Sequence, residues 1–359
     1  MHLQDTTEGV LEEAYAFHKP NRITAVLVDP MRGAVLAMAS RPHIDRDAKN
    51  GINANLAVAA NYEPGSVFKV VTYAAALDAK LTRLDEVINC DPGQKFLGKM
   101  DISDHYSGSL KLTDAFAYSS NRAAYVLAHR LGEKRFLEGV SRFGFGKPTG
   151  VMLTGESSGM VHHPGSRWWD GLTFSRMSYG HALQVTPLQM CMAVASIANG
   201  GTLMRPQIVQ EVRDVSGKVV KNFEPQAVRR VCTEKTAGLM RKAMAAVVEN
   251  PKGTGVQAAI PGVPVAGKTG TSQLYTADGK SIRTGHYCVS FAGFAPVENP
   301  SLCAIVVVDD PDPSTGDLTG GKLAAPIFSK LVQRCLQNMA VSDARQPVAA
   351  STNKKGIQE

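Results

Sequence analysis

Ser66 and Lys69 form an S-x-x-K element at the start of an apolar stretch. Pro64 and Gly65 end the preceding loop, so we expect Ser66 in the first turn of a helix, where free N–H groups and the helix dipole favour negative charge on oxygen. Lys69 follows one turn later on the same face. A serine hydroxyl needs an adjacent base, and a lysine in an apolar helix can have its pKa lowered enough to act as one. The element therefore predicts a nucleophilic serine with a lysine base.

The S-x-x-K pattern alone is not specific, because a second copy runs from Ser351 to Lys354. That copy lies in a polar stretch with no apolar helix to desolvate its lysine. We therefore expect Ser66, and not Ser351, to be the nucleophile.

Ser119 and Asn121 form an S-x-N element after an apolar segment. The Ser119 hydroxyl could relay a proton toward a leaving amine, and the Asn121 amide could hold Lys69 or a substrate amide. An isolated S-x-N is more often a helix cap or a polar turn. Whether this S-x-N element is functional therefore has to be judged together with the other motifs.

Lys268, Thr269, Gly270 and Thr271 contain the only K-T-G of the chain. On a strand beside a cleft, the lysine would supply positive potential and the threonine hydroxyls could bind a carboxylate. Gly270 would let a substrate backbone approach closely. The N–H groups of Thr271 and Ser66 would then form an oxyanion hole.

The same lysine also ends a stretch, residues 262–269, that fits the nucleotide-binding P-loop pattern, and residues 304–309 look like a strand that ends in a metal-binding Asp. A P-loop must follow a buried strand and open a helix. Residues 258–261 are no such strand, and residues 270–273 are typical of a strand that enters a turn. The P-loop interpretation is therefore disfavoured.

Composition excludes several other classes. The 359 residues are 44% hydrophobic and 20% charged, which allows a substantial core. The net charge of +7 is scattered and only 6% of residues are aromatic, so we expect no nucleic-acid binding. None of the six cysteines forms a C-x-x-C pair, and His162 and His163 lack a third metal ligand at suitable spacing. The histidines are expected to be solvated loop residues, and no disulfide scaffold or metal site is predicted.

Apolar periodicity predicts the elements that position these residues. The run 66–81 is apolar on nearly every side and should be a buried central helix. Strands near both ends of the chain, with helices between them, predict one α+β domain whose antiparallel sheet is closed by distant segments. The polar residues 341–359 are expected to be disordered. The other expected helices cover 10–18, 113–130, 233–249 and 322–339, and the expected hairpins pair 23–28 with 34–39 and 286–295 with 302–308.

The ordered set S-x-x-K, S-x-N and K-T-G resembles the motif set of penicillin-binding proteins and serine β-lactamases. The flanking sequence resembles the class B, monofunctional transpeptidases, and Asn121 makes it most similar to the division-type enzymes that build septal wall. The resemblance covers about residues 1–340, which we therefore expect to form one transpeptidase domain. The segments that carry it are 28–30, 33–39, 62–66, 149–156, 179–189, 198–201, 253–255 and 291–296.

The resemblance implies a penicillin-binding transpeptidase (serine β-lactamase-like) fold, with a central antiparallel sheet flanked by helices and an all-helical subdomain. It implies peptidoglycan stem peptides as substrates, with a D-Ala-D-Ala donor and an amine acceptor, and β-lactams as covalent ligands. Ser66 would attack the penultimate D-Ala carbonyl, with Lys69 as the general base. No metal or organic cofactor is implied.

The other motif residues receive roles from the same resemblance. Ser119 and Asn121 would assist proton transfer. Lys268, Thr269 and Thr271 would bind the substrate carboxylate and stabilise the oxyanion.

The resemblance further implies a place at the extracytoplasmic face of the bacterial cell membrane, with a membrane glycosyltransferase and other divisome proteins as partners. Members of the class carry a membrane-spanning helix and a pedestal before the catalytic domain. No apolar stretch here reaches spanning length, and the first residues lack a signal pattern. We therefore expect a shortened or separately encoded catalytic domain.

Two alternatives remain open. A D,D-carboxypeptidase or serine β-lactamase would use the same motifs, although lactamases of this fold are more compact between the second and third motifs and no glutamate-bearing deacylation loop is evident. A non-catalytic β-lactam-binding or divisome scaffold module would not need all three motifs intact.

Overall fold

Residues 2–43, 54–91, 102–104, 106–276 and 281–345 are described in the computed structural model. The second S-x-x-K copy at 351–354 and most of the tail expected to be disordered lie outside these residues.

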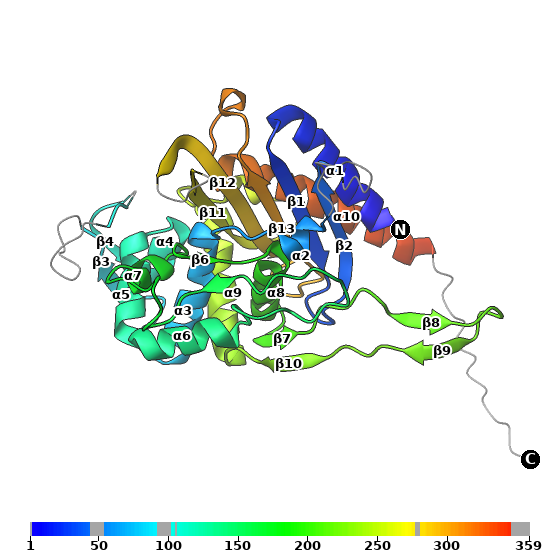
Figure 1. The fold of residues 1–359 in the computed structure, drawn as a ribbon, viewed down its shortest axis with the longest axis horizontal. Helices are drawn as coiled ribbons and strands as arrows, with labels where there is room; N and C mark the ends of the chain where they lie inside the picture. Colours follow the sequence, from blue (N-terminus) through cyan, green and yellow to red (C-terminus); the bar gives the residue numbers. More distant parts are fainter. Residues whose placement is uncertain (1, 44–53, 92–101, 105, 277–280, 346–359) are drawn as a thin grey trace, which may run out of the picture.

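A five-stranded antiparallel sheet forms the centre of the molecule, in the order β11-β12-β13-β1-β2 (Figure 1). Strand β1 pairs with β13 over its whole length, so the first hairpin of the chain is joined to the last. This confirms a sheet closed by distant segments, and β11 with the K-T-G lies at one edge. The strands are β1 (Arg22–Val28), β2 (Val35–Arg41), β11 (Ala266–Tyr275), β12 (Ile282–Ala295) and β13 (Leu302–Asp309).

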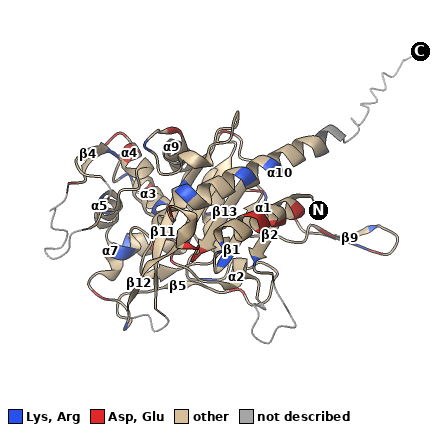
Figure 2. Cartoon of the chain, turned by 90° about the horizontal axis from the view of Figure 1, so that it is seen from above, with Lys and Arg blue, Asp and Glu red and all other residues tan. Residues whose placement is uncertain are grey.

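Helices cover both faces of the sheet because its strands are apolar on both sides. Helices α1 (His2–His18) and α10 (Ala325–Arg345) pack side by side on one face, over Leu27 and Val306 among others. Figure 2 shows the acidic residues of α1 beside the basic residues of α10, where Glu13 pairs with Lys330 and Arg334. The other face packs against α8 (Pro187–Ala198), all of whose residues are buried.

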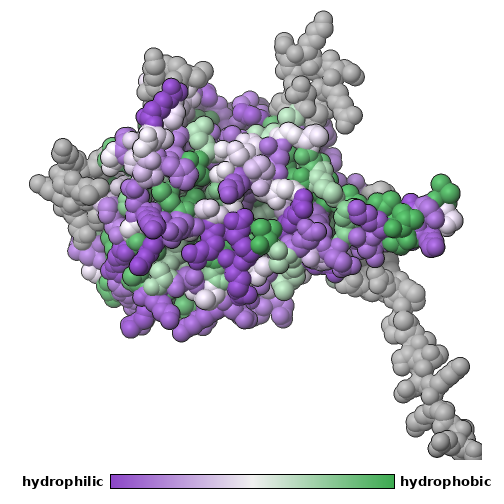
Figure 3. All heavy atoms as spheres, turned by 60° about the horizontal axis from the view of Figure 1, so that its bottom comes forward, coloured by the Kyte–Doolittle hydropathy of each residue, from purple (hydrophilic) through white to green (hydrophobic). Residues whose placement is uncertain are grey.

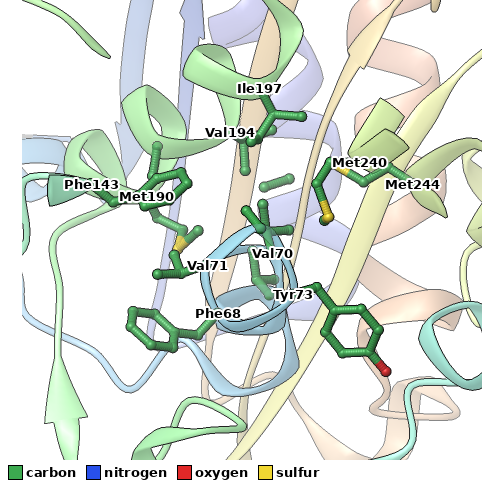
Figure 4. Close-up of a cluster of buried hydrophobic side chains, with 14 of the residues drawn as sticks. Phe68, Val70, Val71, Tyr73, Phe143, Met190, Val194, Ile197, Met240 and Met244 are labelled. Carbon is green, nitrogen blue, oxygen red and sulfur yellow. The ribbon is translucent and has the colours of Figure 1, made fainter. Parts of the chain in front are cut away.

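The predicted central helix is α3 (Lys69–Asp78), preceded by a 3-10 turn at Gly65–Phe68. Figure 4 shows its apolar side chains, among them Val70 and Val71, directed toward Met190 of α8 and Met240 of α9 (Glu234–Glu249). The helix is thus buried on all sides, as its sequence predicted. The helices around it are α4 (Leu112–Ala117), α5 (Asn121–Leu131), α6 (Glu133–Arg142) and α9 (Glu234–Glu249).

An arm of two strand pairs projects from the body (Figure 1), and Figure 3 shows hydrophobic side chains on it. Val215 and Val220, which belong to this arm, are exposed. Its strands are β7 (Thr202–Met204), β8 (Glu211–Arg213), β9 (Val219–Asn222) and β10 (Ala227–Arg230). The remaining short elements are α2 (Leu56–Ala59), α7 (Thr173–Met177), β3 (Val87–Asn89), β4 (Ser109–Lys111), β5 (Met160–Val161), β6 (Leu183–Gln184), 3-10 turns at Val256–Ala258 and Pro313–Thr315, and a π turn at Gly320–Ala324.

Several helix bounds differ from the sequence-based expectation. Helix α1 begins at His2 rather than residue 10, because its polar first turns dock on β2 through hydrogen bonds of Gln4 with the backbone of Met38. Helix α10 continues to Arg345, past the expected boundary at 340. The expected helix 113–130 is two helices, α4 and α5, separated by a turn at 118–120. This turn contains Ser119 of the S-x-N element and sets the backbone conformation of that residue.

Candidate active site

Ser66 lies in the 3-10 turn that leads into α3. Its side chain is partly exposed, whereas Val67, Phe68 and Lys69 after it are buried. Gly65 has φ +52, and a Cβ there would lie 2.8 Å from the Thr271 carbonyl oxygen. The glycine therefore permits the serine turn to sit directly against the K-T-G strand.

The Lys69 side chain is fully buried and points into the second motif. Its Nζ donates to the Ser119 carbonyl oxygen (2.5 Å), to Ser119 Oγ (3.2 Å) and to Asn121 Oδ1 (2.7 Å). Burial lowers the pKa of Lys69 to about 7, although the negative charge of Asp104 opposes this shift. A lysine so placed can be neutral near physiological pH and accept a proton. The predicted contact of Asn121 with Lys69 is confirmed.

Ser119 occupies the turn between α4 and α5 with φ +64, a left-handed conformation that is uncommon for residues other than glycine. The turn directs Ser119 Oγ between two buried lysine amines, because Lys268 Nζ donates to it at 2.9 Å and Lys69 Nζ at 3.2 Å. Burial, and then the like charge of Lys69, hold the pKa of Lys268 well below its ordinary value. The three side chains form one proton-sharing network.

The K-T-G element lies on a strand, β11, as predicted, and this strand is at one edge of the sheet. Because Lys268 and Thr269 are inside a strand rather than before a helix, the P-loop interpretation is wrong. The Thr269 hydroxyl donates to Thr254 Oγ1 (2.8 Å), and Thr271 Oγ1 accepts from the N–H of Gly320 (3.1 Å).

The structure shows a reason for a glycine at 270 that the sequence did not indicate. A Cβ on Gly270 would lie 2.5 Å from Ser290 Oγ and 2.6 Å from the Pro64 carbonyl oxygen. Gly270 therefore allows the strand to lie close to the segment that precedes Ser66.

Residue Asp104 supports the second motif but carries no recognisable sequence signal. Its carboxylate accepts from Ser120 Oγ (2.5 Å) and from the N–H of Arg122 (3.1 Å), which fixes the first turn of α5. The neighbouring Ser103 carbonyl accepts from Asn121 Nδ2 (2.9 Å). Sequence reasoning missed both residues because they reach the site only through the tertiary fold.

The described part of the chain contains no group of three or more His, Cys, Asp or Glu side chains that could hold a metal ion. The six cysteines are buried and unpaired with one another. None of the described helices is both long and apolar enough to cross a membrane.

The edge strand with K-T-G, the buried lysine helix and the S-x-N turn together define the penicillin-binding and serine β-lactamase-like fold. Residues 23–333 match the family described as "Penicillin binding protein transpeptidase domain". The chain belongs to this family.

Named relatives agree with this assignment. The chain is 33% identical to "Peptidoglycan D,D-transpeptidase FtsI" of Escherichia coli K12, over 98% of this chain and 57% of that protein. It is 35% identical to "Stage V sporulation protein D" of Bacillus subtilis, over 96% of this chain and 54% of the relative. The chain thus spans about half the length of the relatives it matches.

Solved structures have the same fold. The transpeptidase domain of Burkholderia pseudomallei penicillin-binding protein 3 superposes with a TM-score of 0.81 at 27% identity, over 95% of each chain. Penicillin-binding protein 3 of the tuberculosis bacterium, complexed with ampicillin, gives 0.85 at 30% identity, over 95% of this chain and 77% of that one. The predicted α+β architecture is confirmed.

The depressed pKa of Lys69 predicts a pH-dependent stability. Between about pH 7 and the unfolded value near 10.4, the unfolded chain holds a proton that the folded protein lacks, so stability rises with pH. The unfolding free energy of wild type relative to Lys69→Met should increase across this window by up to about 1.4 kcal/mol per pH unit, and should flatten below pH 7. Urea unfolding at several pH values measures it. The Lys218→Met variant, which changes an exposed lysine, serves as the control. If the difference in unfolding free energy between wild type and Lys69→Met does not change with pH, the result contradicts burial of the Lys69 amine.

Proposed function

We propose that this chain is the catalytic domain of a peptidoglycan D,D-transpeptidase that acts through a Ser66 acyl-enzyme. The observation that carries the proposal is the network of Lys69, Ser119 and Lys268 next to a partly exposed serine. Family membership and the relatives named as D,D-transpeptidases support it.

The first half-reaction follows from the positions of the donors and acceptors. Neutral Lys69 takes the proton of Ser66 Oγ as that oxygen bonds to the carbonyl carbon of the penultimate D-Ala. The carbonyl oxygen becomes an oxyanion, and we assign its stabilisation to the N–H groups of Ser66 and Thr271. The C–N bond then breaks, and the departing D-Ala nitrogen takes a proton from Ser119 Oγ, which Lys268 or Lys69 resupplies.

The second half-reaction reverses these proton transfers. An amine of a neighbouring stem peptide loses a proton to the same network and attacks the ester carbonyl, and Ser66 leaves with a proton restored. Asn121 keeps the Lys69 amine directed into the site. We assign binding of the donor's terminal carboxylate to Lys268, Thr269 and Thr271, while Gly270 keeps the strand close to the serine loop.

A β-lactam would be attacked at its ring carbonyl in the same way, which leaves a penicilloyl ester on Ser66. Solved relatives of this fold are described as complexes with aztreonam and ampicillin. Labelling with fluorescent penicillin, followed by peptide mapping, should locate the adduct on Ser66. Ser66→Ala should abolish it, and Lys69→Ala should slow it by several orders of magnitude because proton removal is lost. Rapid turnover of the penicillin would instead indicate a β-lactamase, and no Ser66-dependent mass increase would favour a non-catalytic module.

A further test uses Asp104, whose negative charge opposes the lowering of the Lys69 pKa. Acylation should accelerate with rising pH about a midpoint near 7, because only the neutral amine accepts the serine proton. Asp104→Asn retains an acceptor oxygen for Ser120 and Arg122 but removes the negative charge, so the Lys69 pKa falls and the midpoint moves to lower pH. Stopped-flow acylation rates across pH measure the shift. The exposed Asp317→Asn is the control, and a midpoint unchanged by Asp104→Asn would contradict Lys69 as the base.

We also propose that the enzyme works at the septum, on the extracytoplasmic face of the cell membrane, with a membrane glycosyltransferase and divisome proteins as partners. Asn121 in the second motif and the extracytoplasmic location of peptidoglycan support this. Depletion of the encoded protein should block septal incorporation of a fluorescent D-amino acid and leave lateral incorporation intact. Loss confined to the lateral wall would assign it to elongation.

A further inference from the structure

The nucleophile turn is held by a second segment, residues 178–182, which we call the supporting loop. Two main-chain carbonyls of this loop accept hydrogen bonds from the nucleophile segment. The Ser178 oxygen accepts from Thr72 Oγ1 at 2.7 Å, and the Gly180 oxygen accepts from the N–H of Gly65 at 3.0 Å. The supporting loop therefore holds the chain on both sides of Ser66.

The two backbones approach so closely that only glycine fits at position 180. Gly180 has φ +91, and a Cβ there would lie 1.9 Å from the Gly65 carbonyl oxygen. The conformation of the supporting loop thus determines where the Gly65 peptide, and with it the Ser66 N–H, can lie.

The carboxylate of Glu63 joins the supporting loop to the residues just before Ser66. Glu63 Oε1 accepts from the Ala182 N–H at 3.0 Å, and Glu63 Oε2 lies 2.9 Å from His181 Nδ1. The Glu63 side chain is only 17% exposed, so these contacts are shielded from water and stronger than a surface pair. The main-chain oxygen of Glu63 also accepts from Ser272 Oγ of β11 at 2.9 Å. One residue therefore connects the nucleophile turn to the supporting loop and to the K-T-G strand.

We propose that Glu63 is a positioning residue for acyl transfer, which holds Ser66 at the correct place between Lys69 and the N–H of Thr271. The proposal rests on the proposed function. Lys69 donates to Ser119 and Asn121, and Lys268 donates to Ser119 and Thr269, so Glu63 is not among the hydrogen-bond acceptors of either lysine. Removal of the Glu63 carboxylate should therefore displace the nucleophile and leave the base and its pKa unchanged.

Saturation kinetics with fluorescent penicillin separate the acylation rate constant from the affinity of the noncovalent complex. Glu63→Ala should lower the rate constant by ten- to a hundredfold, since a displacement of about 1 Å costs on that order. Its dissociation constant should stay within about twofold, and its pH midpoint should equal that of wild type. Glu63→Gln, which retains an acceptor for Ala182, should recover most of the rate. Glu224→Ala, an exposed carboxylate of the arm, is the matched control.

If Glu63 has a purely structural role, Glu63→Ala should change the affinity, the thermal midpoint and the acylation rate constant together, and that result would overturn the proposal. A wild-type rate constant for Glu63→Ala would also overturn it. If Glu63→Ala does not fold, His181→Ala removes one of the two carboxylate contacts and should show a smaller loss of rate constant alone. An unchanged rate constant for His181→Ala would then reject the proposal.

Amide hydrogen exchange at Gly65 makes the test independent of catalysis. Its N–H bonds to Gly180, so exchange should accelerate in Glu63→Ala even if no penicillin reacts. If Gly65 exchanges faster in Glu63→Ala but the wild-type protein does not react with penicillin, the proposed function is refuted, while the finding that Glu63 holds the turn at Ser66 is retained. Unchanged exchange would refute the positioning role alone.

Discussion

Two buried lysine amines share one serine hydroxyl, and the arrangement of the site depends on this interaction. A charged ammonium without water is unfavourable, and a second one beside it is more so. Lys69 and Lys268 both lie within hydrogen-bond reach of Ser119 Oγ, and burial depresses the pKa of each. Lys69, whose pKa is lowered to about 7, can therefore release and accept a proton near neutral pH, which a solvated lysine could not do.

This interaction requires that three distant segments be held rigidly. Helix α3 supplies Lys69 and is surrounded by α5, α6, α8 and α9, with Met190 and Met240 among the apolar residues that face it (Figure 4). Strand β11 supplies Lys268 from the edge of a sheet that is completed only by the pairing of β1 with β13. The turn before α5 supplies Ser119, in a left-handed conformation that Asp104 stabilises through Ser120 and the first turn of the helix. Core packing thus contributes to function by limiting where these polar atoms can move.

The sequence predicted many of the elements because their signals are local. Both sheet hairpins and the all-apolar helix after Ser66 were found where periodicity indicated them. The helix expected over 113–130 was wrong at its centre, because apolar periodicity does not register a single left-handed serine. The early start of α1 was missed for a related reason: its polar residues bind the β2 backbone, a contact without periodicity.

The sequence by itself determined the residue types of the three motifs, their order and the family, because these depend on side-chain identity and on short-range spacing. Only the tertiary structure decided that Lys268 would meet Lys69 at Ser119, and that Asp104, Thr254 and Glu63 would support them. Those contacts join residues far apart in the chain, and their distances follow from how the sheet and helices pack. The S-x-x-K element could thus be recognised from residues close together in sequence, whereas Ser119, Lys268 and Asp104 join it only in space.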